Sequence, residues 1–286
     1  MAQPDTLPLA PPRSPLAVRA AGLTDPGRVR EANEDHFLVA ELARVLHVRQ
    51  TSLPQPEERR GRSRGLVLLV ADGMGGHAAG EVASALTVET VEAFVTELLR
   101  RFSNLKAEDE TGVLADLREA VRQADARIMD EVAEHPEWAG MGTTLTLAFA
   151  SGRRLFVIHA GDSRCYRLRG GSLERLTEDH TLVAELAAMG RIRPEEMRRH
   201  PRRHVVTNVL GGNEVGVRTD VRAEGIEPGD VLLLCSDGLT DMLDDDRLAA
   251  ILSEERSPEA ACARLIAEAN AAGGRDNITA VVARWE

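Results

Sequence analysis

Four aspartates stand at the ends of predicted core strands, and three of them adjoin a glycine. They are Asp72, Asp162, Asp237 and Asp276. Carboxylates gathered in one place repel one another unless cations neutralise them. Ligation by oxygen alone favours Mg²⁺ or Mn²⁺, whereas zinc prefers nitrogen and sulfur, and the sequence has no His/Cys cluster with zinc spacing. If the four side chains meet, a pair of ions bridged by one carboxylate can generate hydroxide and clamp a phosphoryl group for in-line attack.

The pattern of a strand followed by Asp and Gly recurs along the chain. It occurs at 72–73 and 237–238, and Gly161-Asp162 repeats it in reverse order. Taken alone, Asp-Gly is a common turn, and the pair at 72–73 also fits a strand-to-helix turn in which Asp72 caps the helix. The recurrence favours a metal site over unrelated turns. Such a site requires that these aspartates meet in space.

A second polar segment, 27–39, supplies Arg30, Glu34 and Asp35 within six positions. The planar fork of an arginine can bind phosphate, and the two carboxylates can orient metal-bound water. The alternative interpretation is a solvated charged loop. With Arg30 available for the phosphate, hydrolysis of a phosphate ester is the chemistry that these residues favour.

The elements that must position these residues follow from the hydrophobic pattern. The apolar run 66–70 indicates a buried strand that ends on Asp72, and the glycines at 73, 75 and 76 allow a sharp turn into a helix opened by Glu81. Repeats of three to four residues predict helices within 88–102, 114–132, 248–252 and 257–269, the last with Ser257 as N-cap. Alternating patterns predict hairpins over 143–159 and 164–176, and strands at 230–235 and 278–285.

Three segments differ from this pattern. Residues 1–18 hold five prolines and are expected to be disordered, with 19–286 forming a single domain. The polar stretch 41–64 is expected to be an exposed connection between paired strands, with a regulatory docking patch as the alternative. The irregular segment 179–212 is expected to be a flap that faces the substrate, or else a structural excursion.

Composition narrows the class of protein. Asp and Glu number 46 against 35 Lys and Arg, a net charge of -11, so no basic field offsets the repulsion of a nucleic acid. No apolar run approaches the ~18 residues that a membrane span needs. The cysteines at 165, 235 and 262 are far apart and lie in predicted core elements, which favours buried free thiols and a cytoplasmic location. None lies in a loop motif suited to a nucleophile.

Seven blocks of the sequence resemble the PPM-type (type 2C) metal-dependent protein serine/threonine phosphatases of the bacterial branch. In the family's order, they are GRVREANED, VADGMGGHAAGEVAS, MGTTLTLAF, HAGDSRCYRL, LTEDHTLV, CSDGLTDML and GGRDNITAVVARW. The resemblance implies an α+β fold, a four-layer αββα sandwich of two antiparallel sheets flanked by helix pairs. It also implies hydrolysis of phosphoserine and phosphothreonine in proteins by a hydroxide that bridges two Mn²⁺ or Mg²⁺ ions, in opposition to a bacterial Ser/Thr kinase. A monomer is expected.

The resemblance also implies metal ligands. By position, Asp72 corresponds to the carboxylate that bridges both ions, and the Gly73 carbonyl to a ligand of the second ion. Asp237 and Asp276 correspond to ligands of the first ion. Asp162 corresponds to a residue that, with Asp237, holds a third and weaker ion.

Further roles follow from the same likeness. Arg30 corresponds to the phosphate-binding arginine, and Glu34 and Asp35 to residues that hold metal-bound water. The sequence departs from animal members at Met74, where those proteins have a histidine thought to act as general acid, so the proton donor is not assigned to that position. His77 is given no catalytic role.

Two other functions remain open at this stage. A catalytically silent relative that serves as a binding or sensing module would be marked by loss of a metal aspartate, and all four are present. A two-metal phosphatase of a small phosphorylated metabolite would use the same centre, and only the face presented to the substrate would separate it from a protein phosphatase.

Overall fold

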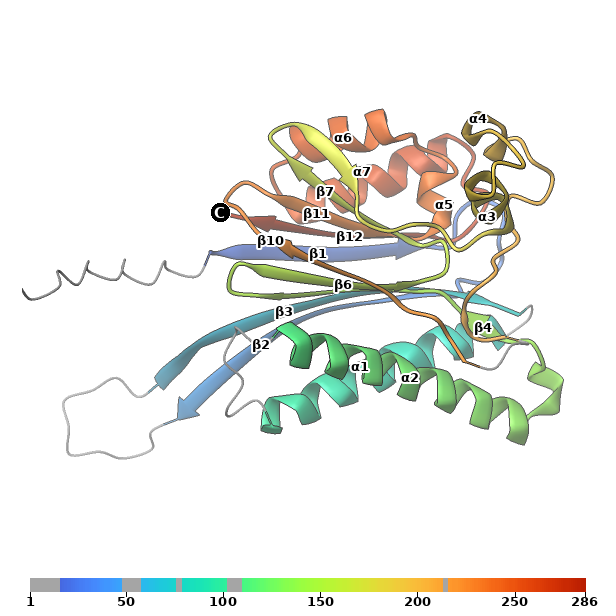
Figure 1. Cartoon of the computed structure of the whole chain (residues 1–286). Helices are drawn as coiled ribbons and strands as arrows, with labels where there is room; N and C mark the ends of the chain where they lie inside the picture. The colour runs from blue at the N-terminus through green and yellow to red at the C-terminus, as the bar shows by residue number, and fades with distance from the viewer. Residues whose placement is uncertain (1–15, 48–57, 76–78, 102–109, 213–215) are drawn as a thin grey trace, which may run out of the picture.

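The computed structural model describes residues 16–47, 58–75, 79–101, 110–212 and 216–286. Most of the proline-rich start, the middle of the polar stretch 41–64 and His77 lie outside the described residues. The described elements form two antiparallel sheets packed face to face, with helices on both outer faces (Figure 1). The four-layer αββα arrangement expected from the sequence is confirmed.

The larger sheet has seven strands and carries the first predicted metal aspartate at the end of a central strand. Its order is β10-β6-β5-β3-β4-β9, and β2 pairs with β3. The bounds are β2 Asp35–His47, β3 Glu58–Met74, β4 Gly142–Thr143, β5 Leu145–Ser151, β6 Arg154–Ala160, β9 Leu210–Gly211 and β10 Asp220–Gly225.

The smaller sheet joins the two ends of the described chain. Its order is β1-β12-β11-β7-β8, with β1 Val18–Asp25, β7 Arg164–Arg169, β8 Ser172–Arg175, β11 Val231–Cys235 and β12 Ile278–Trp285. Strand β1 pairs with β12 over its whole length, from Val18 opposite Trp285 to Asp25 opposite Ile278. Strand β12 therefore lies between β1 and β11.

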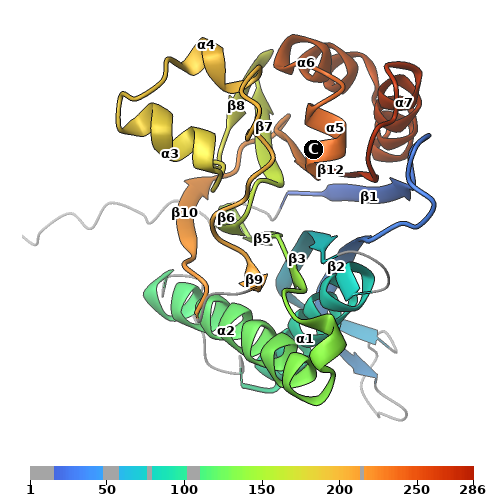
Figure 2. The ribbon, with the colours of Figure 1, turned by 90° about the vertical axis from the view of Figure 1, so that its right-hand side faces the viewer.

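The helices form separate outer layers. Two long helices, α1 Ala79–Arg101 and α2 Glu110–Glu134, cover the seven-stranded sheet, and a 3-10 turn, Pro136–Trp138, follows α2. The five-stranded sheet is covered by α6 Asp245–Glu254 and α7 Pro258–Ala271, with the single turn α5 Asp237–Thr240 beside them. The short helices α3 Leu182–Ala188 and α4 Pro194–Met197 project beside β7 and β8 (Figure 2).

Three aliphatic layers hold the sandwich together. Side chains such as Leu69 and Leu147 pack under α1 and α2, while Leu233 and Val282 pack under α6 and α7. The alternate side chains of the same strands, including Leu68, fill the space between the sheets. Because successive strand residues point to opposite faces, a strand buried on both faces is continuously apolar. The run at 66–70 has this character for that reason.

Helix starts follow the capping chemistry read from the sequence. The Ser257 hydroxyl accepts a hydrogen bond from the Ala260 N–H, and Pro258 occupies the first turn of α7, which confirms the predicted N-cap. The predicted helix over 114–132 and both predicted hairpins are also present, and the predicted helix over 88–102 is present as far as Arg101, where the described residues pause. One difference concerns the polar stretch 41–64, because β2 extends to His47 and β3 begins at Glu58.

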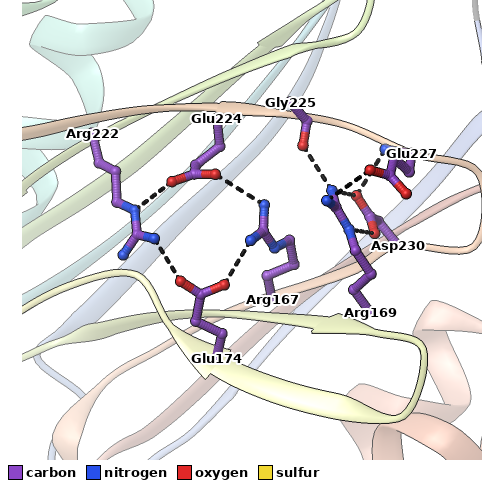
Figure 3. Close-up of polar contacts among 8 residues, drawn as sticks. All are labelled: Arg167, Arg169, Glu174, Arg222, Glu224, Gly225, Glu227 and Asp230. Atoms are coloured by element: carbon purple, nitrogen blue, oxygen red, sulfur yellow. Dashed lines mark hydrogen bonds and ion pairs between the residues drawn. The ribbon is translucent and has the colours of Figure 1, made fainter.

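A ring of four ion pairs joins the edges of the two sheets (Figure 3). Arg222 and Glu224 come from β10 of the larger sheet, whereas Arg167 and Glu174 come from β7 and β8 of the smaller one. Each arginine binds both glutamates, with N–O distances of 2.5 to 3.1 Å. Beside the ring, Arg169 donates to the Gly225 carbonyl and binds Asp230, so it fixes the connection between β10 and β11.

Candidate metal centre

The four predicted metal aspartates come in pairs from the two sheets. Asp72 lies near the end of β3 and Asp162 follows β6, so both belong to the larger sheet. Asp237 opens α5 directly after β11, and Asp276 precedes β12, so both belong to the smaller sheet. The sandwich thus brings carboxylates from two layers to one end, the end where α5 and β4 lie in Figure 1.

The pKa values of two of these carboxyls respond to the charges of other carboxylates at this end of the sandwich. Burial raises the pKa of Asp72 well above its usual range, and the charges of Asp35 and Asp237 add to the rise. Burial likewise raises the pKa of Asp237 well above its usual range, with the charge of Asp162 as the next cause. Burial raises the pKa of Asp162 itself to about 7. Like charges held in a partly desolvated space favour a bound cation.

The donors present fit hard divalent cations. No three Asp, Glu, His or Cys side chains in the described ranges stand close enough to hold an ion by themselves. Mg²⁺ usually keeps several waters and binds through one or two carboxylates, so pairs of aspartates are sufficient. In addition, the Oδ1 atom of Asp35 is buried and has no hydrogen-bond partner. An unpaired carboxylate oxygen of this kind suits a site that holds cations and their water.

Hydroxyl groups fix the backbone on both sides of Asp72 and Asp162. The Thr144 hydroxyl accepts a 3.0 Å hydrogen bond from the Asp72 N–H, and the Thr143 hydroxyl donates to the Asp72 carbonyl. The Thr144 hydroxyl also lies 2.7 Å from the hydroxyl of Ser163, the residue after Asp162. Two aspartates that are 90 residues apart in sequence are thereby held in one arrangement.

Asp35 joins the two sheets at the centre of the site. It stands opposite Asp72 in the β2–β3 pairing and is 3 % exposed. Its Oδ2 atom accepts hydrogen bonds of 2.7 Å from Ser236, which follows β11, and from Thr279 of β12 in the smaller sheet. Burial raises the pKa of Asp35 to about 6, while these two hydrogen bonds oppose the rise.

The loop that carries Arg30 is folded onto the start of β12. The Asn277 side chain donates to the carbonyls of Pro26 and Ala32 and accepts from the Glu34 N–H. Arg30 Nη2 then lies 2.7 Å from Asp276 Oδ2, in an exposed ion pair. The predicted phosphate-binding residue therefore stands beside one predicted metal ligand.

Glu34 lies on the other side of this loop, toward α1. Its carbonyl accepts from the Gly73 N–H and the Ser84 hydroxyl. Burial raises the pKa of its carboxyl.

A side chain at Gly73 would overlap the Gly80 carbonyl oxygen, and one at Gly238 would overlap the Asn277 carbonyl oxygen. The glycines after the aspartates are thus needed for the close approach of one backbone to another.

A cavity of about 360 Å³ adjoins this end of the sandwich. Asp162 and Asp237 line it from the site, and Met197, Arg198 and Arg203 line it from the segment around α4. The predicted flap region, 179–212, thus forms part of a cleft wall. Two further lining residues, Arg164 and Asp179, form a bidentate ion pair with N–O distances of 2.9 and 2.6 Å.

Several residues of the site were not identified from the sequence. The clearest are the hydroxyl and amide neighbours Thr143, Thr144, Ser163, Ser236, Asn277 and Thr279. A signal was available, because Ser163, Ser236 and Asn277 each directly adjoin a predicted metal aspartate in the sequence. Met74 is half-buried and pairs with Gly142 in the β3–β4 ladder, and its thioether cannot donate a proton.

Comparison with known proteins places this geometry in context. The Protein phosphatase 2C family pattern matches residues 58–265. The chain is 39% identical over 273 residues to the serine/threonine protein phosphatase PstP of Mycobacterium tuberculosis, covering 95% of this chain and 46% of PstP. It therefore spans about half the length of that relative. The serine/threonine phosphatase stp of Listeria welshimeri is 34% identical over 259 residues, covering 91% of this chain and 92% of stp.

A solved structure agrees in fold over nearly the whole chain. The catalytic domain of the serine threonine protein phosphatase PstP, in complex with 2 manganese ions, superposes with a TM-score of 0.73. The two chains are 36% identical, and the match covers 94% of this chain and 99% of that one.

Proposed function

The chain belongs to the protein phosphatase 2C family, and we propose that it removes phosphate from phosphoserine and phosphothreonine in proteins in a reaction that depends on Mn²⁺ or Mg²⁺. The observation that carries this proposal is the meeting of carboxylates from both sheets, with Asp72 and Asp237 forming no ion pair to any arginine or histidine in the described parts of the chain.

Asp72, the Gly73 carbonyl, Asp237 and Asp276 would hold two ions, and Asp162 with Asp237 a third and weaker one. Bound ions of this kind lower the pKa of water to give a nucleophile and neutralise charge on the phosphoryl oxygens. Asp35 supports the site, because its Oδ1 atom can accept a hydrogen bond from water while its Oδ2 atom is occupied by Ser236 and Thr279. Glu34 would orient metal-bound water beside Asp35.

Arg30 has the role of binding the phosphoryl oxygens. Its guanidinium is half exposed, and Asp276 occupies only one side of its fork. Planar donors that remain in place as charge develops on the phosphoryl group stabilise the transition state more than the ground state. Met74 offers no proton, so the leaving oxygen is protonated by a group other than the side chain at that position.

The cellular setting is also a proposal. Residues 19–286 would act as one phosphatase domain that opposes a bacterial Ser/Thr kinase, as a monomer in the cytoplasm. Among the described helices, none has the length and apolar character needed to cross a membrane. Within the polar stretch 41–64, residues 41–47 of β2 and 58–64 of β3 lengthen the β2–β3 hairpin (Figure 1).

The test is phosphate release from a phosphothreonine peptide with Mn²⁺, with Mg²⁺ and with chelator. Asp237→Asn removes a central carboxylate, and Asp246→Asn, on the exposed side of α6, is the matched control. We expect turnover that needs the metal and is lost in Asp237→Asn but kept in Asp246→Asn. If the protein binds metal but releases no phosphate from peptides or small esters, the proposed enzymatic activity is wrong. Turnover confined to small esters would indicate a metabolite phosphatase.

A further inference from the structure

The segment 191–204, here called the basic flap segment, differs in charge from the rest of the chain. It contains six arginines and two histidines but only two glutamates, in a protein whose net charge is -11. It includes α4 and lies beside the cleft next to the candidate metal centre. A local positive charge on an acidic protein attracts anions to that place.

The cleft has cations on one wall that are not fully neutralised. Arg198 lines it, is exposed, and forms no ion pair within the described chain. Arg203 and His204 also line it, and within the described ranges the one carboxylate that pairs with either side chain is Asp241, at 4.0 and 3.7 Å. These two distances are longer than those of strong charge-assisted hydrogen bonds.

Several other charged groups of the cleft already have partners. Arg164 and Arg175 both bind Asp179, and Asp245 accepts a hydrogen bond from the Tyr166 hydroxyl. The remaining carboxylates are Asp162 and Asp237 at the metal end and Asp241 at the rim. An anion that enters the cleft therefore finds its free cationic partners on the basic flap segment, with Arg198 the least engaged.

We propose that this cleft binds an acidic side chain of the substrate, a carboxylate or a second phosphate, within a few residues of the phosphorylated serine or threonine. The inference rests on the proposed phosphatase function. Asp162 and Asp237 belong both to the cleft and to the candidate metal centre, so a peptide with its phosphoryl group at the centre has neighbouring residues within reach of the cleft. An extended chain advances only ~3.3–3.6 Å per residue. Arg198 and Arg203 are specificity-determining residues in this view and take no part in the chemistry.

The experiment compares three phosphothreonine peptides and one small aryl phosphate, all with Mn²⁺. The peptides differ only at the flanking positions, which carry glutamate, a second phosphothreonine or glutamine. Arg198→Glu is compared with Arg199→Glu, because Arg199 is exposed, is equally unpaired in the described chain and does not line the cleft.

We expect the wild type to hydrolyse at least one anionic peptide about tenfold more efficiently than the glutamine peptide, mainly through a lower KM, as one charged hydrogen bond implies. Arg198→Glu should bring this ratio of efficiencies close to one. Arg199→Glu should leave the ratio at its wild-type value. Aryl phosphate turnover should be the same in all three proteins. The anionic peptide that is hydrolysed more efficiently shows whether the cleft prefers a carboxylate or a second phosphate.

Two results would overturn the inference while the phosphatase remains. One is equal turnover of the anionic and glutamine peptides by the wild type. The other is an equal loss of preference in both variants, which would assign the effect to general charge on the flap and not to the cleft. A wild type that hydrolyses neither peptide nor aryl phosphate would instead refute the proposed function, and the inference with it.

Discussion

Arg30 donates a hydrogen bond of 2.7 Å to Asp276, a residue 246 positions further along the chain. The pair joins the loop before β2 to the loop before β12, and it places a guanidinium beside the carboxylates of the candidate metal centre. Because the pair is exposed, its contribution to stability is small. The pair matters for function because Arg30 is the residue proposed to bind the phosphoryl group of the substrate.

The first prediction concerns catalysis by Arg30. Arg30→Ala should lower kcat/KM for a phosphothreonine peptide by about 10²–10³, the effect of removing one preorganised donor to a developing oxyanion. Arg30→Lys should recover only part of this loss, because an ammonium lacks the planar fork. Steady-state kinetics with Mn²⁺ provide the measurement. The free energy of unfolding should change little in either variant, and a large loss of stability would argue for a structural role instead.

The second prediction concerns the metal-free protein. In excess chelator at pH 8, Asp237→Asn should be more stable than the wild type by about 1–2 kcal/mol, because it removes one of several like charges from a desolvated group. Added Mn²⁺ should raise the Tm of the wild type, since the ion binds only the folded state, and should raise that of the variant much less. Thermal unfolding with and without Mn²⁺ tests both points. A variant that is less stable than the wild type in chelator would contradict the repulsion.

The third prediction concerns His159, which is 1 % exposed between Thr146, the Glu178 carbonyl and His180, with Asp179 and Asp220 nearby. Burial lowers its pKa to about 4, and the charge of His180 adds to this. A depressed folded-state pKa stabilises the protein above the unfolded-state value of ~6.5, and that stability declines as the pH falls and is gone below about 4. The full effect is at most about 3 kcal/mol.

His159→Gln should therefore be less stable at neutral pH and lose less stability than the wild type between pH 6.5 and 4. Denaturant unfolding across this range gives the comparison. His135→Gln changes an exposed histidine and should retain the wild-type pH dependence. If the difference between the wild type and His159→Gln does not depend on pH, the histidine is not kept neutral by burial.

The fourth prediction concerns the ion-pair ring of Figure 3. Arg167 is the least exposed member, at 11 % of its side chain, and it binds both Glu174 and Glu224. Arg167→Met should cost about 1–3 kcal/mol, because the two carboxylates that share two cations are then left with Arg222 alone. A double-mutant cycle with Glu224→Gln should give a coupling energy of about 0.5–1 kcal/mol. Breaking the solvent-exposed pair of Arg122 and Glu119 on α2 should have no measurable effect, and an equal effect there would show that the ring has no special strength.

The sequence predicts the features of this fold that are local. The strand at 66–70 is recognisable because both of its faces are buried, and the start of α7 because Ser257 and Pro258 are themselves the capping signal. The short helix at Asp237 was not expected as a helix, because its single turn is too brief to create a hydrophobic period. The extension of β2 and β3 into 41–64 was missed because polar residues dominate that stretch.

The site is less accessible to prediction because its supports are distant in sequence. The hydrogen bonds from Ser236 and Thr279 to Asp35 span 201 and 244 positions, and neither hydroxyl shows a pattern that points to its partner. The aspartates themselves were found through the repeated strand-to-glycine pattern and the family likeness. Their roles as ligands remain proposals. What the sequence alone does not contain is the packing of one sheet on the other, which brings these residues together.

The pairing of β1 with β12 has a consequence for how the protein is made. Strand β1 is synthesised before the other described strands, yet within the described sheet its only neighbour is β12, which is synthesised last of them. While the ribosome is still adding residues 278–285, the smaller sheet lacks the strand that joins β1 to β11. Asp276 is added just before this strand, and the hydroxyl of Thr279 is added with it. The smaller sheet, and the carboxylates that it contributes to the candidate metal centre, are therefore complete only once this last described strand has been translated.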